Sequence, residues 1–272
     1  MNNITYMPTV RLAVGGGKGR QDRCFMPNPE HHGQLPALLV SYYYYKTEFH
    51  KIEKRWLYRD WVLDSGAYSA HNSGVEIKID DYIEFCHTKT IEYNNLTEIY
   101  ALDVIGDWRE SVRNTEKMWT AGVEAIPTYH YGEPEDLLKS LCRDYPKVAL
   151  GGAVGLAAPT KLAWAKQCFA RVWPKKLHGF GFGAEQYSMA LPFHSVDASS
   201  WMFAQASFNV QEHLNGGATI LYKRKEEGGE PPHLFRASVE HYLAIERRVS
   251  QRWRKFFIKE GWLTEEPEVI EL

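Results

Sequence analysis

Short apolar runs alternate with amphipathic segments along most of the chain. Several of the runs end in a small or polar residue, which is typical of strands buried on both faces. The runs are Arg11–Gly15, Ala37–Tyr44, Trp61–Gly66, Glu98–Val104, Glu124–His130, Lys147–Gly152, Lys176–Gly181 and His194–Ser199. Helix start and stop signals predict helices between the later runs. These helices are expected over Lys78–Asn94, Trp108–Gly122, Glu133–Tyr145 and Pro159–Val172.

Strands that alternate with helices predict a parallel sheet. Eight such units in about 200 residues favour a (β/α)8 TIM barrel, with an open α/β sheet as the alternative. After the last run, Ser238–Gly261 reads as one long helix. No repeat or linker marks a second domain. We therefore expect one domain over residues 1–272, an α/β barrel with a C-terminal helical extension at about 238–261.

Composition excludes several broad classes. The 272 residues are 44% hydrophobic and carry 32 Lys and Arg against 34 Asp and Glu, which argues against global disorder and coiled coils. The longest apolar stretch, Leu35–Tyr45, is too short to span a bilayer, and the N-terminus lacks a secretion signal. We expect a cytoplasmic protein without a membrane partner. The net charge of −2 means that any polyanion must bind a local patch.

The four cysteines are far apart in the sequence. Cys24, Cys86, Cys142 and Cys168 lack the close spacing of zinc or redox motifs. We expect ordinary thiols, no metal site and no cofactor.

Polar and glycine residues gather where the predicted strands end. In a barrel these ends surround one pocket. Taken singly, each aspartate could cap a helix, each glycine could serve a turn, and the histidine could be a core residue. Three carboxylates converging on one mouth would cost free energy, and such clusters tend to be functional. The residues at these ends are Asp64, Ser65, Tyr68, Asp103, Asp107, His130, Gly151, Gly152 and Asp197.

A close carboxylate pair suits double displacement at a sugar carbon. An aromatic side chain such as Tyr68 could stack on a planar base, and Asp103 could accept hydrogen bonds from its N–H groups.

Six motifs in order along residues 60–201 resemble the tRNA-guanine transglycosylase superfamily. They are DSGAYS, ALDVIGD, IPTYHYGE, ALGGAVG, HGFGFG and HSVDASSW. The resemblance implies a barrel that replaces guanine in a polynucleotide with a 7-deazaguanine through a covalent enzyme–sugar intermediate. By motif position it implies Asp197 as nucleophile and Asp64 as general acid/base. It implies base contacts from Ser65, Tyr68, Asp103, His130 (where the family has glutamine), Gly151 and Gly152.

The departures from the family favour one branch. No cysteine follows Cys168, so the structural zinc site of the tRNA enzymes is absent from the sequence, and ASSWM replaces their arginine-bearing segment. The chain is similar to the 7-deazaguanine DNA transglycosylases of phages and bacterial modification islands. The expected reaction is insertion of a preQ0-like base into DNA. The alternatives are a tRNA-directed transglycosylase and an inactive nucleic-acid-binding barrel.

Basic residues after the barrel are candidates for phosphate contacts. Arg248, Arg252 and Lys255 lie on the predicted C-terminal helix, and Lys223, Arg224 and Lys225 form a second cluster. One face of the helix could follow phosphates while its aromatic face packs on the barrel. The alternative is a solvated amphipathic helix. DNA is the expected partner, with tRNA second.

Overall fold

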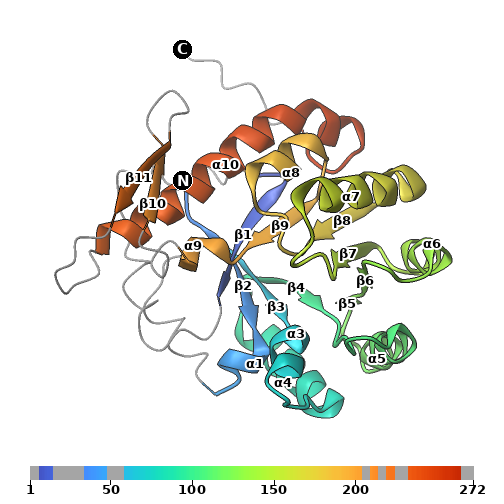
Figure 1. Ribbon diagram of the computed structural model, residues 1–272. Coiled ribbons are helices and arrows are strands. Elements are labelled where there is room, and N and C mark those ends of the chain that lie inside the picture. Colours follow the sequence, from blue (N-terminus) through green and yellow to red (C-terminus); the bar gives the residue numbers. More distant parts are fainter. Residues whose placement is uncertain are drawn as a thin grey trace.

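The computed structural model describes residues 6–14, 34–47, 58–203, 209–213, 219–223 and 232–264. Parallel strands surround a common axis, and helices lie outside them (Figure 1). The strands of this sheet are β1 (Thr9–Val14), β2 (Ala37–Ser41), β3 (Trp61–Asp64), β4 (Leu96–Tyr100), β5 (Ala125–Ile126), β6 (Thr128–His130), β7 (Lys147–Gly151), β8 (Lys176–Gly179) and β9 (Ser195–Ala198). Every predicted apolar run contributes to this sheet.

The barrel closes through one interrupted strand position. The strand order is β5-β4-β3-β2-β1-β9-β8-β7-β6, and only Pro127 separates the two outermost strands. Proline lacks an N–H and interrupts the ladder. Its carbonyl still accepts the N–H of Ala149 at 2.8 Å. Since β5 pairs with β4 and β6 pairs with β7, the two pieces together complete the circle. The predicted (β/α)8 TIM barrel with a C-terminal helical extension is confirmed, and the open sheet is excluded.

The described helices are α1 (Tyr42–Tyr45), α3 (Ala67–Asn72), α4 (Ile79–Glu92), α5 (Trp108–Thr120), α6 (Glu135–Asp144), α7 (Ala158–Val172), α8 (Glu185–Ala190), α9 (Ser200–Phe203) and α10 (Pro232–Lys259). Five of them, α4 to α7 and α10, were predicted, whereas α1, α3, α8 and α9 were not, and α1 begins where the predicted run Ala37–Tyr44 was expected to continue as a strand. Helix α10 begins before the predicted Ser238. An antiparallel pair, β10 (Asn209–His213) and β11 (Thr219–Lys223), was not predicted from the sequence.

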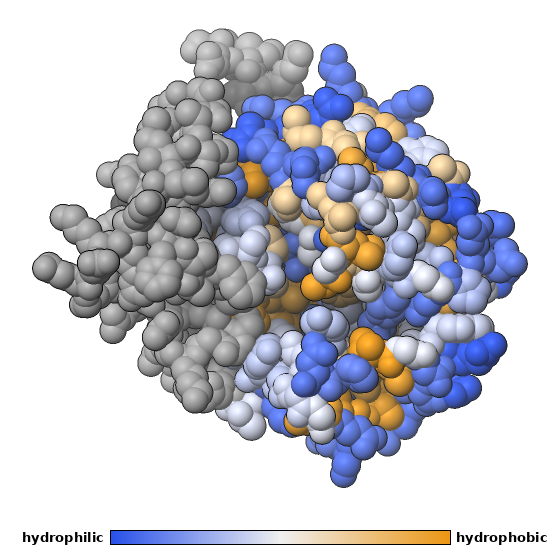
Figure 2. Space-filling view, viewed as in Figure 1, coloured by the Kyte–Doolittle hydropathy of each residue, from blue (hydrophilic) through white to orange (hydrophobic). Residues whose placement is uncertain are grey.

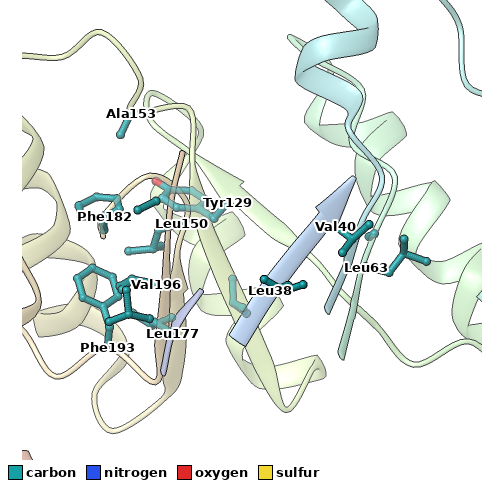
Figure 3. Packing of buried hydrophobic residues seen from close by; sticks show 14 of the residues in the cluster. Leu38, Val40, Leu63, Tyr129, Leu150, Ala153, Leu177, Phe182, Phe193 and Val196 are labelled. Atoms are coloured by element: carbon teal, nitrogen blue, oxygen red, sulfur yellow. The ribbon is translucent and has the colours of Figure 1, made fainter. Parts of the chain in front are cut away.

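Strand alternation produces two cores. Side chains such as Leu38, Val40 and Leu63 face outward and pack under the helices (Figure 3). Their neighbours face the barrel axis, because successive side chains on a strand point to opposite faces. A second cluster fills the inside of the barrel: Leu39, Val62, Tyr100, Ile126 and Ala149. The side chains of this second cluster support the strand ends near which the carboxylates lie.

The C-terminal helix α10 is anchored to the barrel. Nε1 of Trp253 donates to the carbonyl of Ser188 at 2.7 Å, and Phe257 is fully buried. The buried carboxylate of Glu246 accepts the N–H of Val10 at 3.0 Å. None of the helices in the described ranges has the length and apolar character needed to cross a bilayer.

Candidate functional site

Asp64 is the last residue of β3 and the centre of a carboxylate cluster. Its Oδ2 accepts the N–H of Gly66 at 3.1 Å. Burial, together with the charges of Asp103 and Asp197, raises the pKa of Asp64 to about 7. Two neighbouring carboxylates oppose the ionisation of a buried third one. The side chain therefore exchanges a proton near neutral pH. The effects of the Asp103 and Asp197 charges on Asp64 show that the three aspartates converge.

Asp197 lies in β9 and is 7% exposed. Its Oδ1 accepts the N–H of Gly181 at 2.7 Å, and Nε2 of His178 lies 3.6 Å from the same oxygen. The backbone of Asp197 is also held, since its carbonyl accepts the N–H of Gly183 at 2.8 Å. A Cβ on Gly183 would lie 2.7 Å from that carbonyl oxygen, so the close approach requires glycine.

Asp103 lies beyond the end of its strand. The predicted run reached Val104, but β4 ends at Tyr100, where the backbone turns toward β5 and the N–H of Ala101 bonds to the carbonyl of Ile126. Oδ2 of Asp103 lies 3.3 Å from Nε2 of His130. The carboxylate is thus placed in a loop at the mouth and is engaged by a histidine.

His130 is held between two carboxylates. Nδ1 lies 3.1 Å from Oε1 of Glu133, and the backbone N–H of His130 donates to Oε2 of Glu133 at 2.7 Å. Burial lowers the pKa of His130, but the hydrogen bonds and charges of Asp103 and Glu133 outweigh it and raise the pKa to about 10. The ring is therefore a fixed cation at neutral pH.

Two glycines let the backbone of β7 approach His130. A Cβ on Gly151 would lie 3.1 Å from Cδ2 of the His130 ring, and a Cβ on Gly152 would lie 3.0 Å from its Cβ. Gly152 also has a φ of 68°, which favours glycine. These positions have a packing reason for lacking a side chain, whichever ligand contacts their backbone.

The remaining residues predicted at the mouth divide into packed and exposed side chains. Ser65 is buried, and its Oγ accepts the N–H of Ala67 at 3.4 Å. Tyr68 is 56% exposed at the start of α3. Asp107 caps α5, accepting the N–H groups of Arg109 and Glu110 at 3.0 and 3.1 Å. Asp107 therefore follows the helix-capping alternative, while Tyr68 is free to contact a ligand at the rim.

Three side chains of the site were not identified from the sequence. Glu133 and His178 contact predicted residues, as described above. Lys161, on α7, donates to the carbonyl of Gly181 at 2.7 Å. Burial lowers the pKa of Lys161, against the charge of Asp197. His178 could have been found from the sequence, because it is a polar residue within an apolar strand. Lys161 could not, because lysines are common on helices.

A cavity of about 720 Å³ adjoins the cluster and reaches Asp103. Asp103 lines this cavity, but Asp64 and Asp197 do not. The rest of the lining is mixed, with apolar residues such as Leu102, Val104 and Ile105 and charged residues such as Glu76 and Lys78. Figure 2 shows hydrophilic side chains toward the outer edge of the described surface, with apolar patches nearer its middle. The volume lies within the range of small-molecule pockets.

No group of three or more His, Cys, Asp or Glu side chains in the described residues is placed to hold a metal ion. The thiols of Cys86, Cys142 and Cys168 are free, and Cys24 lies outside the described residues.

Some of the predicted phosphate-binding residues lie outside the part of the chain that the structure describes. Arg224 and Lys225 lie outside the described residues, as does the side chain of Lys223. Arg248 is paired with Glu185, its Nε and Nη2 donating to the two carboxylate oxygens at 2.6 and 2.8 Å. The helix face that carries Arg252 and Lys255 is exposed. A nucleic-acid partner stays a prediction.

Comparisons with known proteins support the fold alone. No protein-family model matches the chain, and no curated protein matches it. A solved variant of the tryptophan synthase alpha subunit of Pyrococcus furiosus is 11% identical, with a TM-score of 0.51, covering 89% of this chain and 100% of that one. The alpha subunit of Campylobacter jejuni is 10% identical, with a TM-score of 0.45, covering 72% and 88%. The first of these likenesses supports the TIM barrel.

These findings correct the expected family. The Pyrococcus furiosus structure that supports the fold is a tryptophan synthase alpha subunit, not a tRNA-guanine transglycosylase. The predicted exchange of guanine for a 7-deazaguanine in DNA is therefore wrong, as is its tRNA-directed alternative. The motifs misled because aspartates and glycines at strand ends arise in any (β/α)8 barrel that places its site at this face.

Proposed function

We propose that the protein is a general acid–base enzyme whose site lies at the carboxyl ends of the barrel strands. The observation that carries the proposal is the environment of Asp64. Burial and the neighbouring Asp103 and Asp197 raise its pKa to about 7. A group with a pKa near the working pH combines a useful fraction of the required form with efficient proton transfer.

Asp64 and Asp197 have different surroundings, and this supports different roles. Asp64, half-protonated near neutrality, donates or takes the proton at the reacting atom. Asp197 accepts a short hydrogen bond from the Gly181 N–H and acts as the carboxylate that stabilises positive charge or attacks. Pairs of carboxyl groups in unlike environments commonly divide acid and base roles in this way.

The surroundings also support a class of substrate. The cavity that contains Asp103 is lined by both apolar and charged side chains, with Leu102 and Val104 close to Asp103 in sequence. We expect a small molecule with an apolar body and an N–H or O–H donor. The apolar body would pack against Leu102 and Val104, and the donor would bond to Asp103.

The test compares three Asp→Asn variants on a defined pool of small metabolites, followed by mass spectrometry. Asp64→Asn and Asp197→Asn should each slow consumption of the same compound by about 100-fold or more. Asp107→Asn is the matched control and should keep full activity, because asparagine also caps helices. Equal consumption by wild type and Asp64→Asn would contradict the proposal, as would a pool left intact by the wild type.

A further inference from the structure

Polar side chains form a continuous chain through the inside of the barrel. Glu98 and Lys147 form the end of this chain that is farthest from the site. Nζ of Lys147 lies 2.6 and 2.8 Å from the two carboxylate oxygens of Glu98. The same Nζ donates to Oγ of Ser195 at 2.8 Å, and Oγ of Ser195 lies 2.8 Å from Nδ1 of His178. His178 is fully buried, and its other nitrogen faces Asp197. The chain thus ends at a carboxylate of the proposed site.

The direction of each hydrogen bond follows from the lysine. Burial lowers the pKa of Lys147 to about 8, so its side chain is mainly an ammonium group at pH 7. An ammonium group can only donate, so Oγ of Ser195 accepts from Lys147. The hydroxyl hydrogen of Ser195 is then available to Nδ1 of His178. Burial lowers the pKa of His178, which keeps the ring neutral with a single N–H. With Nδ1 as acceptor, that hydrogen is on Nε2.

The position of Asp197 supports the same tautomer independently. Nε2 of His178 has no hydrogen-bond partner among the described residues, and Oδ1 of Asp197 lies 3.6 Å away. An unprotonated Nε2 would direct a lone pair at the carboxylate oxygen and repel it. A protonated Nε2 would instead attract the oxygen, which favours the tautomer with the hydrogen on Nε2. A buried donor aimed at a carboxylate just beyond bonding distance is a contact that can tighten when a ligand binds.

We propose that His178 is a positioning residue that, with the Gly181 N–H, holds Oδ1 of Asp197 and leaves Oδ2 to meet the substrate. Both groups face Oδ1. The statement about the substrate rests on the proposed function, whereas the statement about His178 concerns the free protein. Lys147 and Ser195 act through the ring by selecting its tautomer.

Histidine ring spectra of ¹⁵N-labelled protein test the tautomer. At pH 7 His178 should give a neutral ring with its hydrogen on Nε2. Ser195→Ala removes the donor to Nδ1 and should change this signature. Ser188→Ala, at another fully buried serine, is the matched control and should leave it unchanged. A hydrogen on Nδ1 in the wild type would overturn the proposal.

A second pair of variants tests the link to Asp197. Asp197→Asn should shift the Nε2 proton resonance of His178. Asp103→Asn should instead shift the ring resonances of His130, which Asp103 contacts. An unmoved His178 proton in folded Asp197→Asn protein would overturn the proposal. These spectra need no substrate. Their result therefore tests the role of His178 separately from the proposed enzyme activity.

Discussion

Nε2 of His130 lies 3.3 Å from Oδ2 of Asp103 at the mouth of the barrel. With Glu133 on the other side of the ring, this contact raises the pKa of His130 to about 10, although burial opposes it. A raised histidine pKa contributes stability that is complete below the unfolded value near 6.5 and is lost as pH rises through the folded value.

The first prediction follows from that window. The wild type should lose stability between about pH 6.5 and 10, by at most about 5 kcal/mol. His130→Gln should be less stable at pH 7 and should lack this dependence. Denaturant unfolding at several pH values measures both. Identical pH profiles for the two proteins would show that His130 is not held as a cation.

The second prediction concerns the cost of ionising Asp64. Its folded pKa is raised from 3.8 to about 7, so the folded state binds this proton more tightly. Wild-type stability should therefore fall as pH rises from about 4 to 7. Asp64→Asn should be stabilised relative to wild type by up to about 4 kcal/mol above pH 7, and by little near pH 4. If the stability difference between Asp64→Asn and wild type were the same at every pH, or changed in the opposite direction, Asp64 would not be a buried carboxyl whose pKa is raised by its neighbours.

The third prediction compares two glycines in the left-handed region. Gly66 has a φ of 75°, and an added Cβ would lie 2.2 Å from Oγ of Ser41 and 2.6 Å from Cβ of Tyr43. Gly74 has a φ of 65° and nothing within 4 Å of such a Cβ. Gly74→Ala should cost about 1 kcal/mol of conformational strain. Gly66→Ala should cost about 3 kcal/mol or more, because overpacking adds to the strain. Equal losses of unfolding free energy would contradict the packing around Asp64.

The fourth prediction separates binding from structure on α10. Arg252, Lys255 and Lys259 are exposed on the helix, whereas Arg248 is paired with Glu185. We propose, as the sequence predicts, that this face of α10 binds DNA. Replacing the three exposed residues by alanine should then weaken DNA binding and flatten its salt dependence, while stability changes by less than about 0.5 kcal/mol. Affinity measured at several salt concentrations checks this.

The matched control for α10 removes the same charge elsewhere. Lys117, Lys139 and Lys166 are exposed on α5, α6 and α7. Replacing them by alanine should leave affinity and salt slope nearly unchanged. Equal weakening by both triple variants would remove any specific role for α10 in binding a nucleic acid.

The fold was predictable because its signal is local. The barrel strands appear in the sequence as apolar runs, several of which end in a polar or small residue, and the start and stop signals of the helices between them are short-range features. Strand ends were less accurate. The run Glu98–Val104 continues past Tyr100 with apolar residues that pack in a loop, and hydropathy does not distinguish the two.

The site was only partly predictable. Asp64, Asp103 and Asp197 were identified from their positions after strands, and their convergence follows from barrel geometry. His178 and Ser195 lie inside β8 and β9, and their contacts depend on register across strands distant in sequence. The reaction could not be read from short motifs, since the barrel itself accounts for them.

The most direct test of the account is a carboxyl ¹³C titration of the aspartates in the wild type and in Asp64→Asn. The account predicts one aspartate that titrates near pH 7 in the wild type and is missing from the variant. If every aspartate of the wild type titrated below about pH 5, near its ordinary range, the proposed acid–base role of Asp64 would be contradicted.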